Sequence, residues 1–218
     1  MTRFTRFALT PLAAAAALFV AAPAFAGPPL LCHPYDIGTA RSLPWSGASA
    51  WFDGDRSYRV ENVVADTEAL LTPSTPVVVR METLRRAAIY ASSDAALAAR
   101  LLDRVVARAE AAAGQPDALL WLDAAYLTGA YREMTMLAQD GRWAGRAAGL
   151  RAALGNRSDS AMIARSLAAR PDDPAIRFAA ALIVSDTDRQ AYREHAGKAR
   201  AGADRDRLLA KNLDHIGL

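Results

Sequence analysis

The sequence has very few of the residues that build disulfide frameworks and clustered metal sites. Its 218 residues include one cysteine and three histidines. A single cysteine excludes an internal disulfide and every cysteine-rich zinc module. After residue 26, no apolar run approaches the ~20 residues that a membrane-spanning helix needs. We therefore expect the chain beyond residue 26 to be soluble and to have no transmembrane segment.

The chain also has little net charge. The chain has 26 lysines and arginines against 23 aspartates and glutamates, a formal net charge of +3. Two of the positive charges, Arg3 and Arg6, precede residue 26, where there is no acidic residue, so the remainder is nearly neutral. A protein that binds nucleic acid through bulk charge needs a larger excess of cations. We expect no nucleic-acid partner.

Motifs that identify common enzyme classes are missing as well. The sequence has no glycine-rich phosphate-binding loop, no G-x-S-x-G nucleophile elbow and no H-E-x-x-H zinc helix. Residues 51–57, WFDGDRS, lack the spaced oxygen ligands and the closing glutamate of a calcium loop. We therefore predict that the protein is not an enzyme and has no cofactor.

Residues 1–26 have the three parts of a secretory signal peptide. Arg3 and Arg6 supply the positive start, and residues 9–22 form the apolar run LTPLAAAAALFVAA. The tripeptide Ala-Phe-Ala at residues 24–26 then places small residues where signal peptidase cleaves. We expect a mature protein in the periplasm or outside a bacterial cell. A lone cysteine is unusual in that oxidising compartment.

The composition changes near residue 60. Residues 27–59 are rich in proline, glycine and aromatic residues and have no regular period. We predict an irregular N-terminal arm there, with a short strand at Tyr58–Val60. Residues 60–218 have apolar residues at helical spacing. They also hold most of the alanine, of which the whole chain has 51 residues. Alanine favours helices but buries little area, so this all-α domain requires close helix packing.

Capping residues and helix breakers predict several helix boundaries. Ser92 or Ser93 is expected to cap a long helix, and Pro174 to begin a later one. Gly129 is expected to break the helix that starts after residue 116, leaving a short partner helix at residues 131–139. The other expected N-caps are Thr75 (before Pro76), Asp159, Asp186 or Thr187, and Asp204.

Two segments resemble tetratricopeptide-type helix hairpins. Residues 166–183, SLAARPDDPAIRFAAALI, are similar to a junction between repeats. Residues 124–137, AAYLTGAYREMTML, are similar to the turn inside one repeat. The resemblance covers about residues 92–218 and implies a right-handed stack of antiparallel helix pairs with a concave face. The resemblance implies no catalytic activity and no particular ligand. The opening motifs PPLLCHPYDIG and SLPW resemble uncharacterised secreted bacterial proteins.

Cys32 and His33 are the residues best suited to metal chemistry. A thiolate and an imidazole both bind soft or borderline metals. The other histidines beyond residue 26 are His195 and His215, in the last two predicted helices. If the arm folds back over the C-terminal helices, these four residues are candidate ligands for one zinc or copper ion.

Other interpretations of Cys32 remain open. The motif PLLCH resembles a haem attachment site that lacks its first cysteine, with His33 as the axial ligand. Cys32 is also a candidate nucleophile, if a histidine base lies within reach. An intermolecular disulfide needs only exposure of the thiol. The simplest alternative is a half-buried cysteine that packs as a small apolar side chain.

The arm concentrates aromatic residues. Tyr35, Trp45, Trp51 and Phe52 are candidate partner-binding residues, because aromatic side chains often anchor interfaces. The alternative is that these rings fill the alanine-rich helical stack as a capping arm.

The sequence as a whole predicts a non-catalytic binding or scaffold module with a tetratricopeptide-like fold. We expect it to bind a protein or peptide on its concave face. The alternative is a metal- or haem-associated protein that uses Cys32 and His33 to hold zinc, copper or haem.

Overall fold

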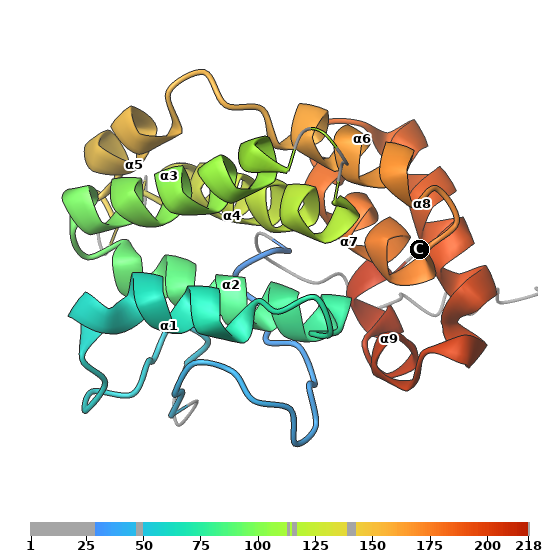
Figure 1. The fold of residues 1–218 in the computed structure, drawn as a ribbon, viewed down its shortest axis with the longest axis horizontal. Helices are drawn as coiled ribbons and strands as arrows, with labels where there is room; N and C mark the ends of the chain where they lie inside the picture. The colour runs from blue at the N-terminus through green and yellow to red at the C-terminus, as the bar shows by residue number, and fades with distance from the viewer. Residues whose placement is uncertain (1–28, 47–49, 113, 115–116, 139–142, 218) are drawn as a thin grey trace, which may run out of the picture.

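The computed structural model describes residues 29–46, 50–112, 114, 117–138 and 143–217. Helices make up all the regular secondary structure of these ranges, apart from one isolated antiparallel bridge between Trp45 and Gly54. The helices pack against one another in pairs (Figure 1). The prediction of an all-α fold is confirmed.

The α-helices of the described residues are α1 (Val63–Leu70), α2 (Val77–Ala91), α3 (Ala95–Ala111), α4 (Ala118–Leu137), α5 (Ala147–Leu154), α6 (Asp159–Ala169), α7 (Pro174–Val184), α8 (Arg189–Gly202) and α9 (Arg207–Lys211). Three 3-10 helices adjoin them: η1 (Val60–Asn62), η2 (Ala203–Arg205) and η3 (Leu213–Ile216). No helix in the described ranges combines the length and the hydropathy that crossing a membrane requires.

Aspartate side chains begin most of the helices after α2. At the start of α3, Asp94 accepts the backbone N–H groups of Ala96 and Leu97. Asp173, Asp188 and Asp206 each accept two backbone N–H groups in the same way at the starts of α7, α8 and α9, and Asp117 accepts one at the start of α4. A carboxylate at this position accepts backbone N–H groups of the first turn, which have no partner within the helix. Its negative charge also complements the positive end of the helix dipole.

Several predicted helix starts are displaced by one or two residues. The caps are Asp94 instead of Ser92 or Ser93, Ser158 instead of Asp159, Asp188 instead of Asp186 or Thr187, and Asp206 instead of Asp204. Pro76 is itself the N-cap of α2, and Thr75 precedes it. Pro174 begins α7 as predicted. Each displaced start has a second capping residue nearby, so the local pattern does not select between them.

Helix α4 runs without a break through Gly129, so the turn predicted at this residue is wrong. A Cβ at Gly129 would lie 2.7 Å from Cδ1 of Leu30 and 3.2 Å from Oδ2 of Asp159. The glycine therefore makes room for the arm and for α6 beside α4. Residues 124–137 are one helix rather than a hairpin turn, whereas residues 166–183 form the helix–loop–helix that we predicted.

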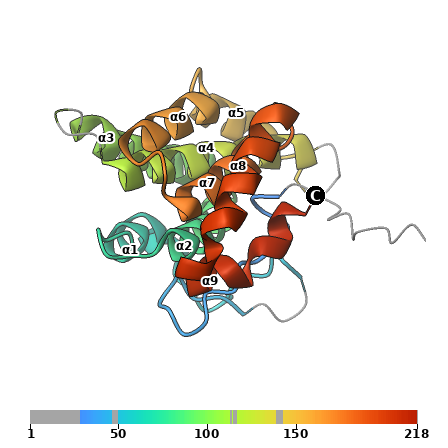
Figure 2. The same cartoon turned by 90° about the vertical axis from the view of Figure 1, so that its right-hand side faces the viewer.

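Helix α4 is the centre of the molecule. It packs against α2, α3, α5, α6 and α7, and most of its residues are buried. Helices α7 and α8 form a closely packed hairpin, and α9 lies beside it at the C-terminal end (Figure 2).

Of the arm predicted at residues 27–59, the structure describes residues 29–46 and 50–59, which have turns, bends and the isolated bridge but no helix. Its buried apolar side chains are Leu30, Leu31, Tyr35, Ile37 and Leu43. In Figure 1 the arm, in blue, passes close to α2. The short strand predicted at Tyr58–Val60 is wrong, because Tyr58 lies in a bend and Val60 begins η1.

Candidate functional site

The helices hold the start of the arm through its backbone. Glu133 of α4 accepts the backbone N–H of Leu30, 3.0 Å from Oε2, and the hydroxyl of Tyr126 donates to the Leu30 carbonyl at 2.6 Å. All three residues are buried. Burial raises the pKa of Glu133 well above its ordinary value, because the charged carboxylate is poorly solvated there.

A buried ion cluster on α2 holds the next part of the arm. Glu82 pairs with Arg85 and with Arg86, each at 2.7 Å. Oε2 of Glu82 also accepts the backbone N–H of Tyr35, and Arg85 donates to the Leu31 carbonyl. Burial acts to raise the pKa of Glu82, but hydrogen bonds and charge from the two arginines lower it overall. The arm is therefore bound by an ionised carboxylate and its guanidinium partner.

The remainder of the arm is fixed in the same way. The Asn212 side chain accepts the backbone N–H of Asp36 at 2.8 Å and donates to its carbonyl at 2.9 Å. The hydroxyl of Tyr90 donates to the Pro44 carbonyl at 2.6 Å. Side chains from α2, α4 and the C-terminal segment thus form hydrogen bonds with backbone groups along the arm.

The structure does not assemble the four predicted metal ligands. The rings of His33 and His215 are 6.1 Å apart, but Nδ1 of His195 lies 3.0 Å from Nη1 of Arg177. Within the described ranges, no group of three or more cysteine, histidine, aspartate or glutamate side chains is placed to hold a metal ion. Cys32, His33, His195 and His215 all lie within these ranges, so they do not form such a group.

The environment of Cys32 does not activate its thiol. Burial, with a smaller contribution from Glu133, raises the pKa of Cys32 from 9.0 to about 11. A nucleophilic cysteine needs the opposite shift, toward a thiolate at neutral pH. Burial also lowers the pKa of the neighbouring His33, which favours the neutral imidazole. This environment suits a small packed side chain better than a nucleophile.

Tyr35 and Trp45, two of the candidate partner-binding residues, pack against helices. The Tyr35 ring is buried, with its centre 4.8 Å from that of His215 and 6.2 Å from that of Phe178 in α7. Trp45 contacts Tyr90 of α2 edge-on at 5.6 Å. These contacts place the arm on α2 and α7 as well as on α4.

Trp51 and Phe52, the other two candidates, pack around Trp143. The Trp51 and Trp143 rings stack at 5.9 Å with an angle of 12° between their planes, and Phe52 contacts Trp143 edge-on. The Arg146 guanidinium lies over the Trp143 ring, 4.5 Å from its centre. None of the four candidate rings is an exposed side chain. Their positions fit the capping arm, which was the alternative interpretation.

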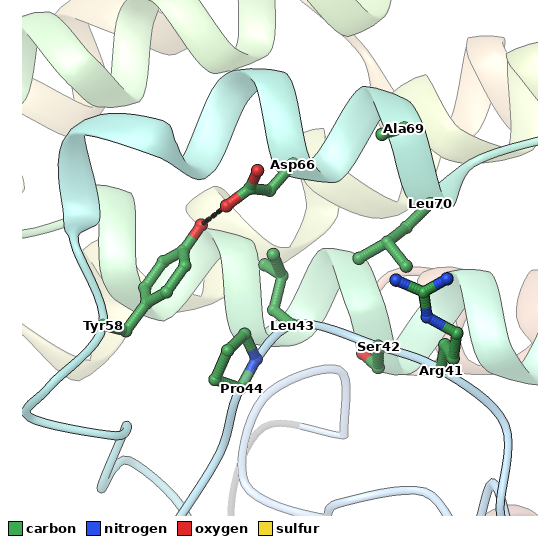
Figure 3. A pocket seen from close by; sticks show the side chains of 8 residues that line it. All are labelled: Arg41, Ser42, Leu43, Pro44, Tyr58, Asp66, Ala69 and Leu70. Atoms are coloured by element: carbon green, nitrogen blue, oxygen red, sulfur yellow. Dashed lines mark hydrogen bonds between the residues drawn. The ribbon is translucent and has the colours of Figure 1, made fainter.

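An open pocket of about 400 Å³ lies between the arm and α1 (Figure 3). Its lining residues are Arg41, Ser42, Leu43, Pro44, Tyr58, Asp66, Ala69 and Leu70. Leu43 is buried at its base, so the pocket rests on the core. The volume falls within the range of small ligand sites.

Polar groups lie at two sides of this pocket. On one side the Tyr58 hydroxyl donates to Oδ2 of Asp66 at 2.8 Å. Burial, and then the hydrogen bond to Asp66, raise the pKa of Tyr58, so the phenol keeps its proton. On the other side lies the exposed guanidinium of Arg41, which has no hydrogen bond or ion pair to another described residue. Aliphatic side chains separate the two polar sides.

A second pocket of about 300 Å³ adjoins the first, and Tyr58 lines both. It lies between residues 52–60, the end of α2 and Trp143. The Tyr58 ring lies 4.7 Å from the Tyr90 ring, and the tyrosine pair forms part of this second pocket's wall.

Sequence reasoning did not identify Arg41 or Asp66 as site residues, and it considered Tyr58 only as one of the clustered aromatic residues of the arm. Arg41 belongs to an irregular segment, and Asp66 occupies an ordinary polar position on a short helix. No motif or spacing joins them, since the pocket forms only where the arm lies beside α1. The one available signal was Tyr58, which lies among the clustered aromatic residues.

Comparison with protein-family models, with curated proteins and with solved structures finds no match for this chain. The functional interpretation therefore rests on the geometry of its own residues.

Proposed function

We propose that the protein is a non-catalytic binding module that holds a peptide segment of a partner protein in the pocket between the arm and α1. The pocket carries this proposal. It is open, has a volume of about 400 Å³, and combines an aliphatic base with a few oriented polar groups. That combination is typical of binding sites. The signal-peptide pattern of residues 1–26 supports a periplasmic or extracellular location.

This location for the ligand differs from the concave inner face that the sequence suggested. The buried polar side chains of α2 and α4 already bind the arm, including Leu30 and Tyr35. A peptide on that face would first have to displace the arm and leave buried polar groups without partners, which is costly. The pocket beside α1 requires no displacement.

A non-catalytic role is also supported by the state of Cys32. Its raised pKa keeps the thiol protonated near neutral pH, where a nucleophilic cysteine would have to be ionised. The proposal therefore assigns this residue to packing of the arm.

An array of synthetic peptides tests the proposed function, with each sequence present as a free acid and as a C-terminal amide. Mature wild-type protein is compared with an Ala69→Trp variant, because Ala69 is exposed and lines the pocket. The matched control is Ala65→Trp, one turn earlier on the same helix, exposed and outside the pocket lining. We expect selected peptides to bind wild type and Ala65→Trp but not Ala69→Trp. No binding, or equal binding by both variants, would contradict the proposal.

A further inference from the structure

We infer that the pocket recognises the free carboxyl terminus of an extended peptide that ends in an aliphatic residue, with Arg41 as the carboxylate-binding group. This inference rests on the proposed function and adds the chemistry of the ligand.

Arg41 supplies the charge that a carboxylate needs. Its guanidinium is exposed at the pocket, and no hydrogen bond or ion pair joins it to another described residue. The other charged group in the lining, Asp66, already accepts the Tyr58 hydroxyl. That hydrogen bond comes from a neutral phenol and leaves the acidic group in place, so the positive side of the pocket is at Arg41, opposite Asp66. A guanidinium there can bind both oxygens of a carboxylate at once.

The surface between the two polar sides is aliphatic. Leu43 forms the base, Leu70 and Ala69 of α1 form one wall, and Pro44 of the arm faces them. A branched aliphatic side chain would cover this surface. In a carboxyl-terminal residue, the carboxylate and the side chain share one Cα, so a single residue satisfies both features in a small volume. An internal aspartate or glutamate would need a second residue for the aliphatic surface and room for the chain on both sides.

The Tyr58–Asp66 pair completes the recognition. Oδ2 of Asp66 accepts the phenol, while Oδ1 remains able to accept a backbone N–H from an upstream residue of the peptide. The Tyr58 hydroxyl holds the side-chain carboxylate of Asp66 in place at the pocket wall. The peptide direction is thereby set, with its carboxyl end at Arg41 and its preceding amides toward Asp66.

Calorimetric titration of the mature protein with two probe peptides tests this inference. The probes are acetyl-Ala-Ala-Ala-Leu with a free carboxylate and the same peptide as its C-terminal amide. We expect the amide to bind about tenfold more weakly, as the loss of one charge-assisted pair predicts. The Arg41→Gln variant should weaken binding of the acid about tenfold and leave binding of the amide unchanged.

Arg59→Gln is the matched control, because Arg59 is an exposed arginine nearby that does not line the pocket. It should change neither affinity more than twofold. Unchanged Tm values would show that both variants fold. If Ala69→Trp blocks array peptides but amidation and Arg41→Gln have no effect, the inference is overturned and the proposed function stands. If no peptide binds, both are overturned.

Discussion

The backbone nitrogen of Leu30 lies 3.0 Å from Oε2 and 3.2 Å from Oε1 of Glu133, a residue 103 positions further along the chain. One turn before Glu133, Gly129 leaves the space that the Leu30 side chain fills. The arm is therefore attached to the central helix by a hydrogen bond and by close packing at the same place. This attachment covers α4 at this point, and the pocket beside α1 stays open.

Replacement of Gly129 by alanine should lower the free energy of unfolding by about 1 kcal/mol. The added Cβ would lie 2.7 Å from Cδ1 of Leu30, which is fully buried and cannot move away freely. Overpacking of this kind costs about 1–3 kcal/mol, and the better helix propensity of alanine returns about 1 kcal/mol. Urea denaturation of both proteins measures the difference.

The control for this change is Gly197→Ala. Gly197 also lies within a helix, but it is exposed, and a Cβ there would meet nothing within 4 Å. This substitution should stabilise the protein by about 0.5–1 kcal/mol. Stabilisation by Gly129→Ala as well would show that the arm does not press against α4. In a Leu30→Ala background, the cost of Gly129→Ala should largely disappear.

The stability of the protein should depend on pH through Glu133. The unfolded chain releases this proton near the ordinary pKa of 4.5, whereas burial makes the folded protein keep it to higher pH. The folded state then binds more protons, so the unfolding free energy falls as pH rises above 4.5, until the folded carboxyl ionises. Asp186 and Asp159 add to the raised pKa, while Arg132 and the Leu30 N–H oppose it.

Glu133→Gln should remove this contribution, because an amide does not titrate. The wild type should lose stability relative to the variant as the pH is raised from about 4.5. Denaturation at a series of pH values gives the two curves. Parallel curves would mean that Glu133 has an ordinary pKa in the folded protein.

The buried pair of Arg80 and Asp123 should contribute far more than an exposed pair. Their atoms approach to 2.6 Å, and the Arg80 side chain is 1% exposed. Arg80→Met leaves a buried carboxylate without its partner and should cost about 3–5 kcal/mol. Arg104→Met is the matched change in the pair with Glu68, where the arginine is 60% exposed. It should cost less than about 1 kcal/mol. Similar losses in the two variants would contradict this account.

The thiol of Cys32 should react slowly with iodoacetamide at neutral pH. Its pKa of about 11 leaves very little thiolate, and the side chain is half-buried. The alkylation rate, followed by mass spectrometry, should rise continuously as the pH approaches 11 and should be slower at pH 7 than that of free cysteine. Fast alkylation near neutral pH would instead support a nucleophilic role.

The helical class was predictable from local signals, because those signals lie within a few residues of the structure they specify. Asp173 and Pro174 form a cap and a first helical residue, and α7 begins there as expected. Where two capping residues are neighbours, as at Ser93 and Asp94, the choice between them is set by the packing of the whole helix. Such errors move the start of a helix by one or two residues, and they neither add nor remove a helix.

The larger errors concern contacts between distant segments. Its neighbours in the sequence indicate that Gly129 breaks a helix. Its role is instead to leave space for the Leu30 side chain, about a hundred positions away in the sequence. The pocket has the same origin, because Arg41 and Asp66 line one pocket only where the arm lies beside α1. A single sequence contains no spacing that joins such residues.

Hydrogen–deuterium exchange of the mature protein, with and without acetyl-Ala-Ala-Ala-Leu, tests the central claim most directly. The claim is that the arm stays bound to the helices while a peptide occupies the pocket beside α1. We predict added protection in residues 41–46 and 63–70, and unchanged protection at the amides of Leu30 and Tyr35. Faster exchange at those two amides on peptide binding would show that the ligand displaces the arm from α2 and α4, and would contradict the account.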